Sequence, residues 1–221
     1  MMNYAIVPHW FSGYNSLFEM IFFIVAFMVG IYALRIYKLS SMRDSRLFGT
    51  SFLMFSGAYL IQSILNFAAS YSMSMGACHN NSLFSMHSLS AIAIYLHIIL
   101  FTAGLVTLAY MALRIRNFAA YSFFLAVTVL IILFSSNILY TFYAVSSILL
   151  VYILFYYLRN YLRTRKKTQL MVFVAFLFLL FAKIHFIFSL NHGSFYVAGH
   201  ILEFIAYALV FASLITIIRR K

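Results

Sequence analysis

Acidic residues are nearly absent from this 221-residue chain, which has three Asp and Glu residues against fifteen Lys and Arg residues. Charged residues of both signs make up only 8% of the chain, whereas hydrophobic residues make up 66%. A soluble fold of this size has too little interior to bury so much apolar surface. The composition therefore excludes a soluble domain and predicts an all-α, polytopic membrane protein.

Cysteine and proline are each represented by one residue, Cys78 and Pro8. A single cysteine excludes an intrachain disulfide and gives no indication of the redox compartment. The net charge of +12 would suggest nucleic acid as the partner of a soluble protein. Here the basic residues flank apolar runs, so we expect a lipid bilayer as the partner and no nucleic acid.

Seven long apolar runs divide the chain, which we treat as one domain over residues 1–221. At roughly 1.5 Å per residue each run can cross a hydrocarbon core of about 30 Å, the fourth one barely. The first 13 residues carry no Lys or Arg, unlike a secretory signal peptide, so we expect the first span to be retained. The predicted spans are residues 14–36, 47–71, 87–113, 118–134, 138–158, 169–190 and 194–218.

Basic residues are confined to alternate connections between these runs. Every Lys and Arg except Lys183 lies in residues 35–46, 114–116, 159–167 or 219–221. The other connections, at 73–86, 135–137 and 191–193, carry neither residue type. Because positive charge favours cytoplasmic loops, this pattern predicts an N-terminus outside and a C-terminus inside.

The costliest polar side chains inside the spans share one depth. They are Glu19, Gln62, Asn66, His97, Lys183, His200 and Glu203, from five different spans. Helical rise places them roughly 8 to 15 Å from the outer ends of their spans. Ionisable groups in lipid cost several kcal/mol each, so we expect them to face the bundle interior and to have partners. The alternative is that each is an independent structural device, such as an interhelical hydrogen bond.

Helical spacing groups some of these side chains on shared faces. Gln62 and Asn66 follow Tyr59 on one face, and His200, Glu203 and Tyr207 form a second stripe. Lys183 and His185 point about 200° apart, so they cannot face one pocket. We predict Lys183 inside, paired with Glu19 or Glu203, and His185 near the interface. Alternatively, Lys183 extends to the outer headgroups.

The band of polar residues is compatible with three kinds of function. The preferred hypothesis is an integral membrane ligand-binding or sensory module, whose outer-half pocket holds a small-molecule ligand. Its predicted ligand-binding residues are Glu19, Tyr59, Gln62, Asn66, His97, Lys183, His200, Glu203 and Tyr207. A transporter is disfavoured because no span has a Gly or Pro interruption at the band.

The alternative is a metal- or haem-dependent membrane oxidoreductase or hydrolase. His97, His200 and Glu203 together are a two-histidine, one-carboxylate set of the kind that binds divalent metals. Haem would instead need two axial histidines on facing helices, such as His97 with His200 or His185. Whether the protein is an enzyme, and which cofactor it uses, stay open at this point.

Two short segments resemble a known family. Residues 16–27, SLFEMIFFIVAF, and residues 199–207, GHILEFIAY, are similar to the MASE3-like seven-helix membrane sensor domains of prokaryotic histidine kinases and diguanylate cyclases. The resemblance implies a multi-pass protein of a prokaryotic-type plasma membrane, with Glu19 and His200 at the ligand site. Gln62 and Asn66 depart from the acidic residue and histidine expected there. No output domain follows Lys221, so signalling would need a partner protein.

Overall fold

The computed structural model describes residues 12–74, 86–189 and 193–218, and these form seven α-helices without a strand. The helices are α1 (Ser12–Ser40), α2 (Arg43–Ser74), α3 (Met86–Leu113), α4 (Phe118–Leu133), α5 (Ile138–Thr164), α6 (Lys167–Ser189) and α7 (Gly193–Ile218). The all-α prediction is confirmed. Most of the predicted connection at 73–86 lies outside the described residues. Several helices extend beyond the predicted spans at their basic ends, because Arg and Lys are good helix formers.

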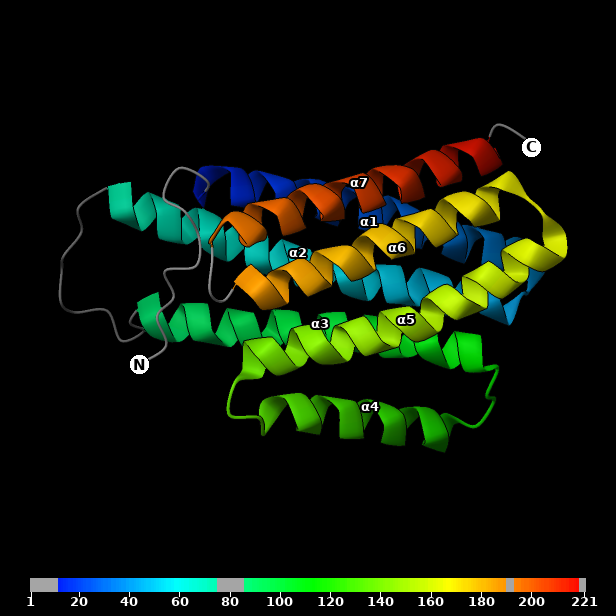
Figure 1. Cartoon of the computed structure of the whole chain (residues 1–221), viewed down its shortest axis with the longest axis horizontal. Helices are drawn as coiled ribbons and strands as arrows, with labels where there is room; N and C mark the ends of the chain where they lie inside the picture. Colours follow the sequence, from blue (N-terminus) through cyan, green and yellow to red (C-terminus); the bar gives the residue numbers. More distant parts are fainter. Residues whose placement is uncertain (1–11, 75–85, 190–192, 219–221) are drawn as a thin grey trace.

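Six of the described helices form a closed ring, and the remaining one, α4, lies outside it (Figure 1). Around the ring, α1 packs on α2, α2 on α3, α3 on α5, α5 on α6, α6 on α7, and α7 returns to α1. Helix α4 contacts only the outer side of α3 and α5. The interior of the ring therefore receives side chains from every helix except α4.

Within the described residues, six helices are long and apolar enough to cross a membrane, and they are the same six that form the ring. Helix α4 is apolar but has only 16 residues, or about 24 Å of helical rise against a hydrocarbon core of about 30 Å. Its Phe118 and Phe123 side chains are 75% and 72% exposed. Such large exposed aromatic side chains are stable next to lipid. The six span-length helices of the ring and the apolar surface of α4 together indicate a membrane protein.

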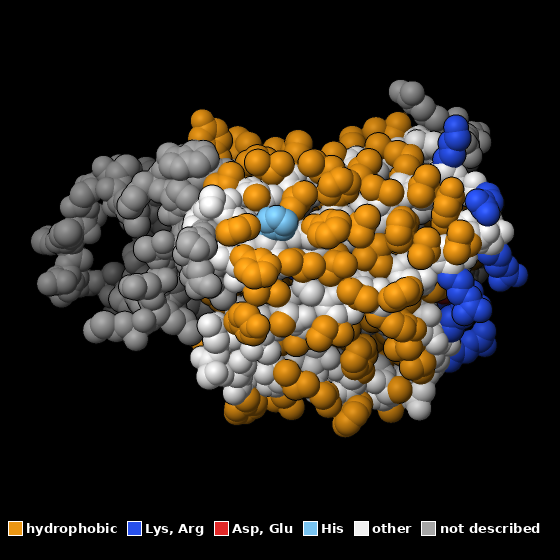
Figure 2. Space-filling model, in the orientation of Figure 1, with side chains coloured by type: hydrophobic (Ala, Val, Ile, Leu, Met, Phe, Trp, Pro, Cys, Tyr) orange, Lys and Arg blue, Asp and Glu red, His pale blue; other side chains and the backbone are white. Residues whose placement is uncertain are grey.

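Lys and Arg side chains gather at one end of the molecule, near the C-terminus, which we call the basic end (Figure 2). Three helices finish there in a left-handed residue other than glycine: Ser41 after α1, Arg114 after α3 and Arg165 after α5, with φ of 51° to 55°. Each reverses the chain within a short connection. The clustering of these tight turns brings the basic connections together at one end.

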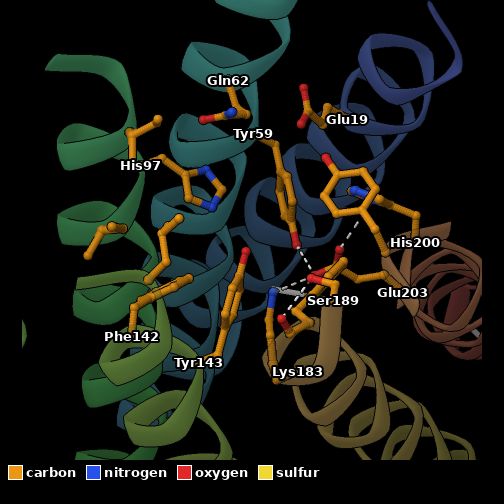
Figure 3. A pocket seen from close by; sticks show the side chains of 15 residues that line it. Glu19, Tyr59, Gln62, His97, Phe142, Tyr143, Lys183, Ser189, His200 and Glu203 are labelled. Atoms are coloured by element: carbon orange, nitrogen blue, oxygen red, sulfur yellow. Dashed lines mark hydrogen bonds and ion pairs between the residues drawn. The ribbon is translucent and has the colours of Figure 1, made fainter. Parts of the chain in front are cut away.

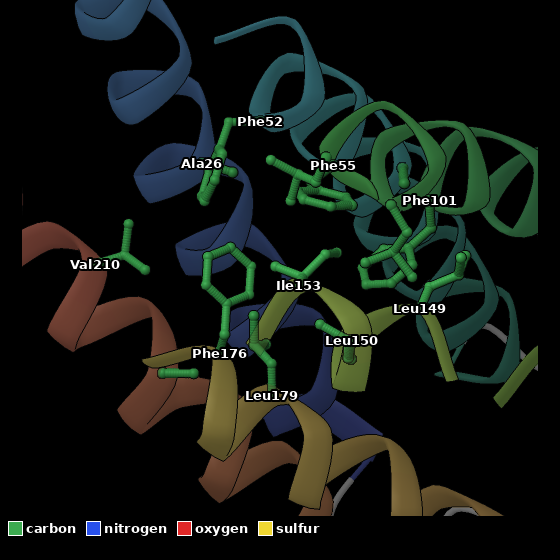
Figure 4. Packing of buried hydrophobic residues seen from close by; sticks show 14 of the residues in the cluster. Ala26, Phe52, Phe55, Phe101, Leu149, Leu150, Ile153, Phe176, Leu179 and Val210 are labelled. Atoms are coloured by element: carbon green, nitrogen blue, oxygen red, sulfur yellow. The ribbon is translucent and has the colours of Figure 1, made fainter. Parts of the chain in front are cut away.

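An apolar layer fills the middle of the ring, and we call it the septum (Figure 4). It consists of buried side chains from all six ring helices: Ala26, Phe52, Phe55, Phe101, Leu149, Leu150, Ile153, Phe176, Leu179 and Val210. On each ring helix, the septum residues lie between residues that line one cavity and residues that line a second cavity. One is a polar cavity away from the basic end, and the other, of about 340 Å³, lies toward it and includes Asp44, Asn160 and Gln169. The septum therefore separates the two cavities.

Candidate functional site

The polar cavity has a volume of about 160 Å³ and is lined by all six ring helices (Figure 3). Seven of the nine residues predicted at the ligand site line it: Glu19, Tyr59, Gln62, His97, Lys183, His200 and Glu203. Residues that are far apart in sequence thus meet because they occupy one level of the ring. At about 30 Å³ per water molecule, the space would hold about five waters or a comparably small ligand.

Glu203 is the centre of a buried polar cluster at the wall of this cavity. The ammonium Nζ of Lys183 donates to Glu203 Oε1 at 2.7 Å, and the hydroxyl of Tyr59 donates to the same oxygen at 2.8 Å. The Nδ1 of His200 lies 3.9 Å from Glu203 Oε2. The side chains of Lys183 and Glu203 are only 4% and 2% exposed, so this ion pair is desolvated. Lys183 therefore faces the interior and does not extend to the headgroups.

Aromatic rings complete the surroundings of the Lys183 ammonium. Its Nζ lies 4.2 Å from the ring centroid of Phe101 and 5.2 Å from that of Phe186. Both distances are within the range of a cation–π interaction, which strengthens as water is excluded. With one carboxylate and two ring faces as neighbours, Lys183 already has its partners inside the protein.

Glu19 also lines the cavity and has different partners. Its Oε2 accepts a hydrogen bond of 2.7 Å from the side-chain amide of Asn66, which joins α1 to α2. Ser16 and Ser63 reinforce the same helix pair, since each hydroxyl donates to the other residue's backbone carbonyl at 3.2 Å. Glu19 is buried, with 4% exposure, and no Lys or Arg forms an ion pair with it among the described residues.

His97 of α3 and His185 of α6 differ in their surroundings. His97 lines the cavity, and its Nδ1 lies 3.1 Å from the carbonyl oxygen of Ala58. Because a carbonyl only accepts, Nδ1 carries the proton and Nε2 of a neutral ring is an acceptor. His185 instead bonds to the Phe181 carbonyl of its own helix at 2.8 Å, away from the cavity. Lys183 and His185 thus face opposite ways, in agreement with their helical spacing.

Two predicted site residues do not line the cavity. Asn66 lies behind Glu19 and holds its carboxylate. Tyr207 is buried beside the cluster, with its ring centroid 5.5 Å from that of Tyr59 and 5.1 Å from that of Phe22. Both residues therefore contact lining residues, and they would affect a ligand only by positioning those residues.

The sequence prediction missed much of the aromatic lining. The aromatic residues Phe142 and Tyr143 of α5, Phe186 of α6 and Tyr196 of α7 line the cavity, and so does Ser189 of α6. Helix α5 has no Asp, Glu, Lys, Arg or His side chain at this level, so intramembrane charge gave no indication of its contribution. The available signal was helical spacing: Tyr196 lies one turn before His200, and Phe186 three residues after Lys183.

The alternative metal set receives no support from the structure. In the described ranges, no three His, Cys, Asp or Glu side chains are grouped so that they could hold a metal ion, and this includes His97, His200 and Glu203. Lys183 and Tyr59 also hydrogen-bond to one oxygen of Glu203. A haem group is also far larger than a cavity of about 160 Å³, which is small even beside typical ligand pockets of about 300–1,000 Å³.

Comparison with known proteins gives no relative: no protein-family model, curated protein or solved structure matches this chain.

Proposed function

We propose that the chain crosses a prokaryotic-type plasma membrane seven times, with its N-terminus outside and its C-terminus inside. Six span-length helices and the gathering of Lys and Arg at one end support this topology (Figure 2). Helix α4 lies along α3 and α5 with exposed aromatic side chains, as expected of a short lipid-facing span. The assignment to a prokaryotic plasma membrane rests on the resemblance of residues 16–27 and 199–207 to sensor domains.

Thiol labelling of intact cells tests the topology. In a Cys78→Ser background, a membrane-impermeant maleimide is expected to label Ser136→Cys but not Arg116→Cys or Lys166→Cys. The last two should react only after permeabilisation. Helix α4 separates residue 116 from residue 136, and α5 separates residue 166 from residue 136, so each lies one span away. Equal labelling of residues 116 and 136 would show that α4 does not cross, and the opposite pattern would invert the orientation.

We also propose that the polar cavity binds a small cation, such as a protonated amine of a few heavy atoms, and that the protein is a membrane ligand-binding or sensory module. The observation that carries this proposal is the Glu19 carboxylate, which lines the cavity without a cationic partner among the described residues. A lone carboxylate within a membrane costs several kcal/mol, and a bound cation would offset that cost. Lys183 would attract an anion, but Glu203 already neutralises it.

The shape and lining of the cavity fit the same ligand class. Tyr59, Phe142, Tyr143 and Tyr196 present aromatic rings to the space, and such rings attract organic cations. A volume of about 160 Å³ suits a ligand much smaller than those of typical pockets, which have about 300–1,000 Å³. The septum closes the inner side of the cavity, which favours binding over passage. For sensing, we propose a partner protein that reads the bound state.

Glu19→Gln tests the ligand class in detergent-purified protein. For the unaltered protein, methylammonium at ten times its Kd should stabilise by about 1.4 kcal/mol, because the ligand binds only the folded state. That corresponds to about 3–6 °C in Tm for a chain of this size. The Gln variant keeps an acceptor for Asn66 but lacks the charge, so it should lose the ligand-dependent shift while folding normally.

Asp44→Asn is the matched control, since it removes the same charge far from the polar cavity, and its methylammonium shift should be unchanged. Acetate serves as the anionic comparison and should give no shift. Stabilisation by acetate and not by methylammonium, or an unaltered shift in Glu19→Gln, would contradict the proposal.

A further inference from the structure

Three arginines line one hollow at the basic end, which adjoins the axial cavity at that end and shares Tyr156 and Asn160 with it. Arg159 and Arg163 lie on α5, and Arg114 follows the last turn of α3. The hollow has a volume of about 330 Å³ and is otherwise lined by Ala112, Leu113, Tyr152, Tyr156 and Asn160. We call it the arginine hollow.

Local structure explains why these side chains converge. Tyr152, Tyr156, Arg159 and Arg163 recur every three or four residues, so they form one stripe on α5 that faces the end of α3. Arg114 has a φ of 55°, and its backbone N–H bonds to the Met111 carbonyl at 3.1 Å. This left-handed residue ends α3 beside the α5 stripe and brings the third guanidinium to the hollow.

The charge of the arginine hollow is not balanced within the protein. No Asp or Glu lines it, and no ion pair to Arg114, Arg159 or Arg163 occurs in the described part of the chain. Asp44, the acidic residue nearest in depth, lines the axial cavity at this end and not the hollow. Three guanidinium groups around one space repel each other, so an anion that fits there is bound favourably.

We propose that the arginine hollow binds the phosphate group of an anionic membrane lipid. Guanidinium groups recognise phosphate oxygens in bidentate fashion, and basic pockets between spans at a membrane surface bind lipid headgroups. Phe155 and Leu162 lie on the same helix and are 66% and 55% exposed, which provides apolar surface for acyl chains beside the stripe. Tyr152 and Tyr156 suit the level of the headgroups, where tyrosine is enriched. This inference is independent of the ligand of the polar cavity.

The test compares lipid binding of the detergent-purified protein by native mass spectrometry. Dihexanoyl phosphatidylglycerol carries the anionic phosphate, dihexanoyl phosphatidylcholine is the zwitterionic comparison, and inorganic phosphate is the free anion. We expect phosphatidylglycerol to bind at least tenfold more tightly than phosphatidylcholine. The triple variant Arg114→Gln, Arg159→Gln, Arg163→Gln should lose this preference, whereas Arg159→Lys should keep part of it because charge remains but bidentate geometry is lost.

A control of equal charge change is Arg165→Gln, Lys166→Gln, Lys167→Gln, whose side chains do not line the hollow and which should retain the preference. The single variant Arg159→Gln gives the same comparison if the triple variant does not fold. If inorganic phosphate competes with phosphatidylglycerol in the unaltered protein but not in the triple arginine variant, the hollow binds free phosphate as well as lipid phosphate. Equal binding of the two lipids, or equal losses in the two triple variants, would overturn the proposal.

Discussion

Lys183→Met is expected to cause one of the largest losses of stability in this protein. The substitution keeps most of the side-chain volume but leaves Glu203 buried, 2% exposed, without its ammonium partner. Breaking a buried ion pair by removing one partner costs about 3–5 kcal/mol. For a chain of this size the Tm in detergent should fall by about 10 °C. The measurement is thermal unfolding of the purified variant beside the unaltered protein.

The second half of the pair identifies the cause of that loss. Glu203→Gln leaves the Lys183 charge unpaired and should also destabilise, whereas Lys183→Met combined with Glu203→Gln removes both charges. The double variant should therefore be more stable than Lys183→Met alone, with a positive coupling energy. Lys38→Met, an exposed lysine at the basic end, is the control and should change little. Additive losses would mean that the two side chains are not a desolvated pair.

Gly104→Ala should destabilise strongly although it adds a single methyl group. A Cβ at this position would lie 2.5 Å from Cε1 of Phe55 and 3.0 Å from the backbone oxygen of Ser51. The Phe55 ring cannot turn aside freely because it packs on Phe52 and Phe101 within the septum. Helices α2 and α3 must separate, as at other crossings that depend on small residues. We expect a loss of about 3 kcal/mol, the upper part of the range for overpacking.

Gly57→Ala is the matched comparison on α2. Its nearest neighbour would be Cδ1 of Leu100 at 3.6 Å, an ordinary contact. Alanine is the better helix former by about 0.5–1 kcal/mol, so this variant should be slightly stabilised. The same chemical change is thus expected to have opposite signs at residues 57 and 104. A similar response at both positions in thermal unfolding would contradict the role of Gly104 in the α2–α3 contact.

Intramembrane charge allowed much of the site to be predicted, because its cost leaves few arrangements. Glu19, His97, Lys183 and Glu203 had to face the interior, and their equal depth placed them in one layer. The sequence left two partners open for Lys183, and only the ring order decides between them, since α6 packs directly on α7. Helix order around a bundle depends on packing between distant segments, and the spacing of residues within one helix does not reveal it.

Residues without charge were harder to assign. Tyr143 and Phe142 belong to an aromatic-rich helix in which many rings face lipid, so composition alone does not distinguish the lining rings. Tyr207 shares a stripe with Glu203 on α7. It does not line the cavity, because its ring packs against the ring of Tyr59. The length of α4 was predicted as barely sufficient for a span, and at 16 residues it remains the shortest helix.

The distribution of polar contacts gives the ring a mechanical character. The mutual hydrogen bonds of Ser16 and Ser63 clamp α1 to α2, and the Lys183–Glu203 ion pair clamps α6 to α7. Both contacts lie near the level of the polar cavity, and the Tyr59 hydroxyl joins α2 to α7 by donating to Glu203. A change in charge or hydrogen bonding at Glu203 would therefore reach both helix pairs at once.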